Sequence, residues 1–303
     1  MNNLILPDRD DLLGSNYVTK IGAFIYGKIN NYDTYYNKNF PYFNSLYMKP
    51  IIDNSKEKIE NQKYIDRGHA IRQNQAYPVI ELQEDLISYF RENYKNYFYQ
   101  ILREEAEKRN YKLPWEDSSK IICIHIRLYD GHRHHGSDCQ DYDGRGSGNY
   151  IKELIENNQL ENYSKDNMKK YARKNGFNWG KNPHPDRQVA IGIDKLEKMV
   201  IKFKRDYPDK EIHIVTKLIK HKNNLRYLKL FKKYNLKVHS NNDYDYDLWL
   251  LIHSEILVLS KSTYSLIAGY YHQGKEVNYP VWGVFASCGL YTKYDKSGWK
   301  YYI

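Results

Sequence analysis

The sequence predicts an α/β protein built on a parallel β-sheet. In the second half of the chain, short apolar and β-branched runs alternate with segments whose apolar residues recur at helical spacing. Strands and helices that alternate in this way form parallel sheets, which bind ligands at the carboxyl ends of their strands. The length of 303 residues suits two domains better than one core, and we expect them at residues 1–117 and 118–303.

In the N-terminal domain the first expected element is a helix within the segment "LLGSNYVTKIGAFIYGKI", residues 12–29. Gly14 and Asn16 precede its apolar residues and indicate a turn that opens it. The polar, tyrosine-rich segment that follows predicts no regular element. From Ile80 to Ala106 apolar residues recur at helical spacing, which predicts the strongest helix of the chain. The polar segment 109–120 then marks the domain boundary.

The C-terminal domain begins with a strand at Ile121–Ile126, a short β-branched run between polar residues. Residues 130–187 are rich in turn-forming residues, with one short helix expected around 149–158. Asp194 is a suitable N-cap for the next helix. The remaining expected elements are strand 211–216, helix 223–235, strand 236–240, a helix opened by Asp247, strand 256–259 and a final helix that starts in a Ser/Thr cluster.

The chain is basic. Its 47 Lys and Arg residues exceed its 37 Asp and Glu residues, which gives a net charge of +10. Such a surface attracts anions, including nucleic acid, phosphates and nucleotide-sugars. The basic residues are spread along the chain without a dense tail, which argues against nucleic acid as the main partner.

The cysteines and the N-terminus indicate a compartment. Cys123, Cys139 and Cys288 form no CxxC pair and no even-numbered framework, which favours a reducing environment. The N-terminus resembles no signal peptide, and no apolar run approaches membrane-spanning length. We therefore expect a cytoplasmic protein with no membrane span, in a setting such as that of a bacterial or viral enzyme.

The segment "IHIRLYD" is the first candidate site. His125 and Arg127 lie on one face of the expected strand, because strand side chains alternate with a period of two, and Ile124 and Ile126 lie on the other. The arginine offers a planar fork for a phosphate, and the histidine can hydrogen-bond a base or a sugar. A buried ion pair between Arg127 and Asp130 is an equally good explanation.

The second candidate site is the segment "DLWLLIHSEILVLSKSTYS". Hydroxyl side chains gather where its last helix begins, and exposed N–H groups at a helix N-terminus bind phosphate. Ordinary N-capping explains the same residues. The hydroxyl residues are Ser260, Ser262, Thr263 and Ser265.

Together the two segments resemble the GDP-fucose-dependent fucosyltransferases, the group of α-1,2-, α-1,6- and protein-O-fucosyltransferases. "HIRLYD" is similar to the family motif H-x-R-R-x-D at His125, Arg127 and Asp130, but Leu128 stands where the family has its second arginine. The Ser/Thr cluster is similar to the family's serine-rich segment, at the distance from Asp247 found in the α-1,6 branch.

The resemblance covers mainly residues 119–130 and 212–280, and more weakly the segment of Gly14 and Asn16 before the first helix. It implies two Rossmann-like α/β domains that face a cleft, the GT-B arrangement of glycosyltransferases. Residues 118–303 would then bind the nucleotide-sugar, and residues 1–117 would form the acceptor side.

The activity implied is an inverting, metal-independent transfer of fucose from GDP-fucose, or of another sugar from its GDP-linked donor, to a glycan or other hydroxyl acceptor. We expect no cofactor, no metal and no nucleic-acid partner. The resemblance further implies that Arg127 grips the donor diphosphate and stabilises the departing GDP. His125 and Asp247 would address the guanine and ribose, and Ser262 and Thr263 would hydrogen-bond the β-phosphate.

Cleavage of a glycosyl–phosphate bond builds negative charge on the diphosphate, which preorganised cations and N–H groups stabilise. Because Leu128 replaces an arginine, another basic residue such as Arg133 or Arg145 would have to contribute. An inverting transfer also needs a base for the acceptor hydroxyl, and we assign Asp138 to this role. The neighbouring candidates are His135, Asp141 and Asp143.

Two other functions fit parts of the sequence. A non-enzymatic module could bind nucleic acid or anionic glycans through its lysines and tyrosines. A metal-dependent hydrolase could use the histidine-rich loop, although its spacing matches no standard zinc pattern. The metal-capable residues of that loop are His132, His134, His135, Asp138 and Cys139.

Overall fold

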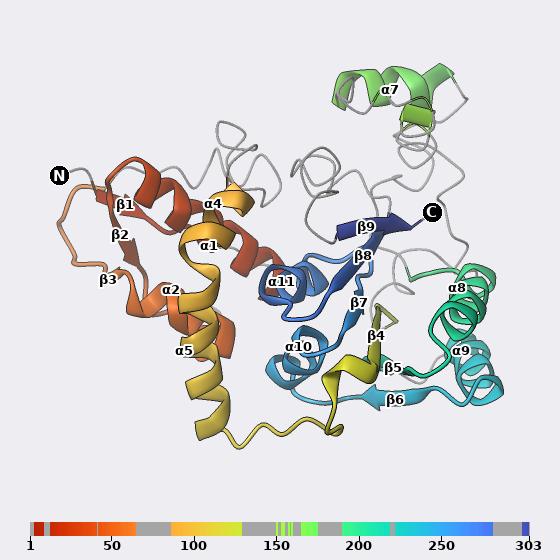
Figure 1. Cartoon of the computed structure of the whole chain (residues 1–303). Helices are drawn as coiled ribbons and strands as arrows, with labels where there is room; N and C mark the ends of the chain where they lie inside the picture. The colour runs from red at the N-terminus through yellow and green to blue at the C-terminus, as the bar shows by residue number, and fades with distance from the viewer. Residues whose placement is uncertain are drawn as a thin grey trace. The chain divides into compact units, whose positions relative to one another are not determined.

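The structure is a computed structural model that divides the chain into two compact units, drawn in Figure 1. The first unit comprises Met1–Leu113 and Leu266–Tyr271, and the second comprises Pro114–Ser265 and His272–Ile303. The residues that the structure describes are 3–8, 13–40, 42–64, 86–128, 150, 153–154, 157, 159, 165–174, 190–218, 222–280 and 299–302.

The first unit combines a short parallel sheet with helices. The strands lie in the order β1-β2-β3 and have only two to four residues each, which is why the sequence pattern did not predict them. They are β1 (Asn3–Ile5), β2 (Asp33–Tyr36) and β3 (Lys56–Glu57). The helices are α1 (Leu13–Ile29), the 3-10 turn η1 (Leu46–Met48), α2 (Lys49–Asp53), α4 (Leu86–Asn93) and α5 (Lys95–Lys108).

Two expectations for this unit need correction. Gly14 and Asn16 form no turn before the first helix, because α1 already begins at Leu13, and Asn16 is fully buried within it. Packing on nearly all sides of α1 outweighs the turn preference of these residues. The single helix expected up to Ala106 is two helices, α4 and α5, that meet at Tyr94.

The junction at Tyr94 is a local bend in the backbone. Its φ is −127°, yet its N–H donates to Phe90 O and its carbonyl accepts from Phe98 N, both at 2.8 Å. The hydrogen-bond ladder therefore continues through the bend. The aromatic rings of Phe24, Phe90 and Phe98 pack together here and bury the apolar face that the sequence pattern showed.

The second unit is a six-stranded parallel sheet in the order β6-β5-β4-β7-β8-β9. Counted from β4, this is the order 3-2-1-4-5-6 of the Rossmann fold. The predicted parallel α/β architecture is therefore confirmed for this unit. The strands are β4 (Ile121–Ile126), β5 (Glu211–Thr216), β6 (Lys237–Ser240), β7 (Ile256–Val258), β8 (Glu276–Pro280) and β9 (Trp299–Tyr302).

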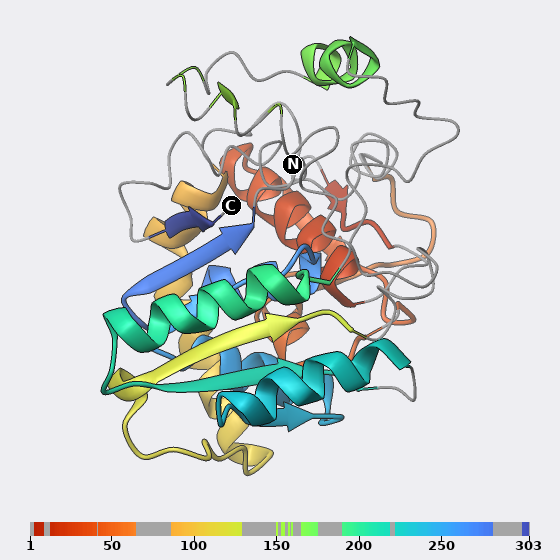
Figure 2. The same ribbon diagram turned by 90° about the vertical axis from the view of Figure 1, so that its right-hand side faces the viewer.

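Helices cover both faces of this sheet. Figures 1 and 2 show α8 and α9 side by side over one face, with α10 on the other. Among the described residues, no helix is both long and apolar enough to cross a membrane. The helices after Pro114 are α7 (Lys165–Lys174), α8 (Ile193–Asp206), α9 (Lys222–Lys233), α10 (Tyr244–Ile252) and α11 (Thr263–Tyr271), of which α11 belongs to the first unit from Leu266 onward.

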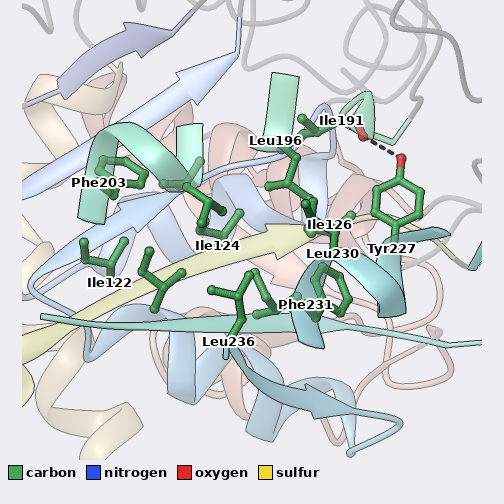
Figure 3. Close-up of a cluster of buried hydrophobic side chains, with 14 of the residues drawn as sticks. Ile122, Ile124, Ile126, Ile191, Leu196, Phe203, Tyr227, Leu230, Phe231 and Leu236 are labelled. Carbon is green, nitrogen blue, oxygen red and sulfur yellow. Dashed lines mark hydrogen bonds between the residues drawn. The ribbon is translucent and has the colours of Figure 1, made fainter. Parts of the chain in front are cut away.

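The main apolar core of the second unit lies between β4, β5 and the α8–α9 layer (Figure 3). Ile122, Ile124 and Ile126 all contribute to it, whereas Cys123 and His125 do not. The alternation predicted for β4 is therefore confirmed, and it leaves His125 on the opposite face. Tyr227 fixes α9 to the segment before α8, because its hydroxyl donates a hydrogen bond to Ile191 O at 2.5 Å.

The helix starts differ from the predicted caps. α8 begins at Ile193 with Gly192 as its N-cap, so Asp194 lies in the first turn and does not cap it. α10 begins at Tyr244, one turn earlier than expected. Its N-cap is Asp243, whose carboxylate accepts from Asp245 N at 3.1 Å. Acidic residues are favoured both in the first turn, where Asp194 lies, and at the N-cap, where Asp243 lies, because both positions are at the positive end of the helix dipole.

Candidate functional site

The carboxyl edge of the sheet carries the candidate site. The chain runs from β4 outward to β5 and β6, then returns to β7 on the other side of β4. The strand order thus reverses between β4 and β7, and the ends of these two strands form the switch point at which open α/β sheets bind ligands.

At this point His125 meets Ser260. His125 is the penultimate residue of β4, and Ser260 follows the end of β7. The Nδ1 atom of His125 and the Oγ atom of Ser260 lie 2.7 Å apart and form a hydrogen bond. Both side chains are buried, His125 with 7% of its surface exposed. The hydrogen bond holds the imidazole in one orientation across the switch point.

The start of α11 lies directly beside this pair. Ser262 is its N-cap, with a side chain that accepts from Tyr264 N at 3.2 Å. The Ser265 hydroxyl lies 3.1 Å from Ser260 O and 3.0 Å from Ser262 O, to which it donates. N-capping, the ordinary explanation of the Ser/Thr cluster, therefore applies to Ser262. Thr263 opens the helix and is 6% exposed.

Tyr264 connects the histidine to α10. Its ring centroid lies 5.3 Å from that of His125, with the planes tilted by 43°. Its hydroxyl donates to Tyr244 O at 2.6 Å. Burial raises the pKa of Tyr264 well above its ordinary value, and the charge of Asp247 raises it further. The phenol therefore stays neutral and acts as a fixed part of the wall around the site.

Asp247 is the buried carboxyl group of the site. Only 8% of its surface is exposed, and its Oδ1 accepts a hydrogen bond from Asn242 Nδ2 at 2.9 Å. Burial raises the pKa of this carboxyl group to about 6, while the bond from Asn242 and the charge of Lys217 act in the opposite direction. A buried carboxylate in this position is a strong acceptor for N–H or O–H groups of a ligand.

Two lysines at this edge of the sheet were not among the site residues predicted from the sequence. Lys261 stands between Ser260 and Ser262 and is only 6% exposed. Lys217 directly follows β5, within electrostatic reach of Asp247. Lys261 could have been found, since a lysine among hydroxyl residues at a helix start adds a cation where an anion would bind.

Arg127 directly follows β4 and is partly buried. Leu128, which replaces the second arginine of the similar motif, is fully buried in the apolar core and contributes no charge to the site. The remaining predicted residues lie outside the described part of the chain: Asp130, Arg133, Asp138, Arg145 and the histidine-rich loop with His132, His134, His135, Cys139, Asp141 and Asp143. Within the described ranges, no three metal-ligating side chains come together.

Comparison with known proteins gave remote similarities. No family model matches the sequence, and no curated protein matches it. Among solved structures, POFUT1 in complex with GDP overlaps 80% of this chain and 68% of its own, at 13% identity and a TM-score of 0.32. POFUT1 in complex with GDP-fucose overlaps 80% and 69%, at 12% identity and a TM-score of 0.33.

The NodZ alpha-1,6-fucosyltransferase soaked with GDP-fucose overlaps 91% of this chain and 94% of its own, at 10% identity and a TM-score of 0.39. These values describe distant overlaps. The strand order of the second unit by itself identifies its architecture.

Proposed function

We propose that the protein is a glycosyltransferase that binds a GDP-linked sugar, most specifically GDP-fucose, at the carboxyl edge of its second unit. The observation that carries this proposal is the hydrogen bond between His125 and Ser260. It joins the two segments that resemble fucosyltransferase motifs, the end of β4 and the Ser/Thr cluster, at one switch point beside the start of α11. The motifs are far apart in the sequence, and the strand order brings them together.

The diphosphate would lie at the start of α11. The first N–H groups of this helix, the Thr263 hydroxyl and the cations of Lys261 and Arg127 supply donors of the kind that stabilise a departing nucleoside diphosphate. In this role Lys261 supplies the positive charge that Leu128 lacks. No metal is required for this step, because the protein itself provides the neutralising charge.

The nucleoside would extend toward α10. Asp247 offers a carboxylate that can accept from the ribose hydroxyls or from the N–H groups of guanine, and uracil presents a different pattern of donors. His125 has its ring fixed by Ser260 and contributes a second polar contact. Transfer is proposed to be inverting, with Asp138 as the base that takes the proton of the acceptor hydroxyl.

The test is calorimetric titration of the full chain with GDP, GDP-fucose, GDP-mannose and UDP, in the presence of a chelator. GDP and its sugars are expected to bind and UDP to bind at least about tenfold more weakly, since discrimination by polar contacts is large. Arg127→Ala and Lys261→Met should each weaken GDP binding by about tenfold or more, because each removes a charge-assisted contact.

Arg103→Ala is the matched control, because this arginine lies on α5 of the first unit with 54% of its side chain exposed, and it pairs there with Glu107. It should leave binding unchanged. Absence of GDP binding by the unmodified chain would refute the proposal. If GDP binds but Asp138→Asn transfers fucose at the normal rate, the donor site stands and the assignment of the base is wrong.

A further inference from the structure

The net positive charge of the protein is concentrated in two helices. α8 carries five Lys and Arg against three acidic residues, and α9 carries five against none. These helices therefore hold +7 of the chain's net charge of +10. They lie side by side on one face of the sheet, and Figure 2 looks directly onto them.

The same outer surface also exposes aliphatic side chains. Leu225 is 60% exposed, Ile201 48% and Leu228 39%. Along α9, the spacing of three and four residues places Leu225 and Leu228 on the same outer face as the exposed Lys229 and Lys232. The opposite face of α9 supplies the buried Tyr227, Leu230 and Phe231 of the core.

The two helices form one continuous layer. Glu197 of α8 accepts hydrogen bonds from Lys233 Nζ of α9 at 2.7 Å and from the Tyr234 hydroxyl at 2.8 Å. This contact neutralises one of the three acidic residues of α8. Because Lys233 is neutralised with it, the net charge of the two helices stays at +7, and the layer is held in place by the core beneath it.

The combination of charge and aliphatic side chains distinguishes between anionic partners. Nucleic acid is bound by cations with aromatic rings for stacking or with side chains that read base edges. Here the exposed apolar groups of α8 and α9 are aliphatic. Leucine beside lysine on one helix face is the pattern of a helix that lies in a lipid interface, with its aliphatic groups among the acyl chains and its cations at anionic headgroups.

We propose that this α8–α9 face, defined by Ile201, Leu225, Leu228 and the surrounding basic residues, docks on an anionic phospholipid bilayer. The association is peripheral, with both helices parallel to the membrane surface. It involves none of the residues of the proposed donor site, so the two proposals stand or fall separately.

The test is sedimentation of the full chain with vesicles of phosphatidylcholine alone or of phosphatidylcholine mixed with phosphatidylserine. Binding is expected only to the anionic vesicles and should decrease as salt is added. Lys229→Gln with Lys232→Gln should weaken it by about 25-fold, since each lysine near such a surface contributes on the order of fivefold. Leu225→Gln with Leu228→Gln should weaken it by about tenfold.

Matched controls come from the first unit. Ile59→Gln alters a residue that is 64% exposed, and Lys63→Gln with Lys108→Gln removes the same charge from exposed positions. These variants should bind vesicles as the unmodified chain does, and circular dichroism shows whether each is folded. Equal binding to both kinds of vesicle would overturn the proposal. The proposal would also be overturned if the chain bound DNA but not vesicles, and if the leucine substitutions left DNA binding unchanged.

Discussion

Asp247, the buried carboxyl group of the proposed site, shows at the level of one residue how a buried charge weakens the fold. Its carboxyl group is buried, and its pKa of about 6 lies above the value of an exposed aspartate. The folded chain therefore binds this proton more tightly than the unfolded chain does. By linkage, stability falls as the pH rises through the interval between the two pKa values, and the cost is complete above the higher one.

Asp247→Asn is expected to raise the free energy of unfolding by about 2 kcal/mol near pH 8, because it removes a buried charge and keeps the bond from Asn242. The gain should disappear below about pH 3, where the aspartate is protonated in both states. Urea denaturation at the two pH values measures it. The same substitution should weaken GDP binding, and a variant that is stabilised yet binds GDP normally would remove Asp247 from the site.

Individual site residues could be predicted only where the local pattern was enough. The position of His125 on the face opposite the isoleucines followed from strand alternation. N-capping was one of two explanations that the sequence offered for the Ser/Thr cluster, and Ser262 is the residue that caps α11. The partner of His125 could not be predicted, because Ser260 lies 135 residues further along the chain. Only the order of β4 and β7 in the sheet brings them together.

At the level of elements, the strands that are apolar, β-branched runs were predicted, and β8 was missed. β4 and β5 are apolar, β-branched runs and appear where expected. β8 has the sequence EVNYP, with Glu276 and Asn278 buried, and no apolar pattern indicates it. Glu276 is compensated by Lys300 of β9 at 2.5 Å, a partner that the sequence alone does not identify.

A pair of histidines links β5 to β6 on the face opposite the apolar core. His213 Nδ1 and His239 Nε2 lie 2.8 Å apart, their rings stack at 18°, and the edge of Trp115 contacts His213. Burial, together with the charge of His213, lowers the pKa of His239 to about 4. The pKa of His213 is also lowered by burial, against the opposing effect of Glu211.

In the folded protein both histidines have pKa values below that of an unfolded histidine. The free energy of unfolding is therefore highest above about pH 6.5, and it decreases as the pH falls below this value, because the unfolded chain binds protons more readily. His239→Gln should reduce the loss of stability between about pH 7.5 and pH 5 by about 1 kcal/mol, a value discounted for the partial exposure of the ring. Denaturant titrations at both pH values test this. An unchanged pH dependence would show that the pair does not titrate in this range.

For the molecule as a whole, the distribution of charge follows from helix placement. Read along the chain, the basic residues looked evenly spread, which argued only against nucleic acid. The fold places α8 and α9 together and so gathers charges that are up to about forty residues apart in sequence onto one surface. The sequence therefore gives the net charge, but the surface on which this charge gathers is known only from the arrangement of the helices in the fold.

Among the strands that the structure describes, β6 lies at the end of the sheet order and pairs with β5 alone. An unpaired strand edge is a template for association between molecules, which proteins oppose with short edge strands and lysines. β6 has four residues, and its exposed Lys237 stands next to Val238, which is 37% exposed. Lys237→Val should therefore promote self-association, visible as concentration-dependent light scattering, whereas Lys63→Val should not. On this reading, Lys237 helps to keep the protein monodisperse at high concentration.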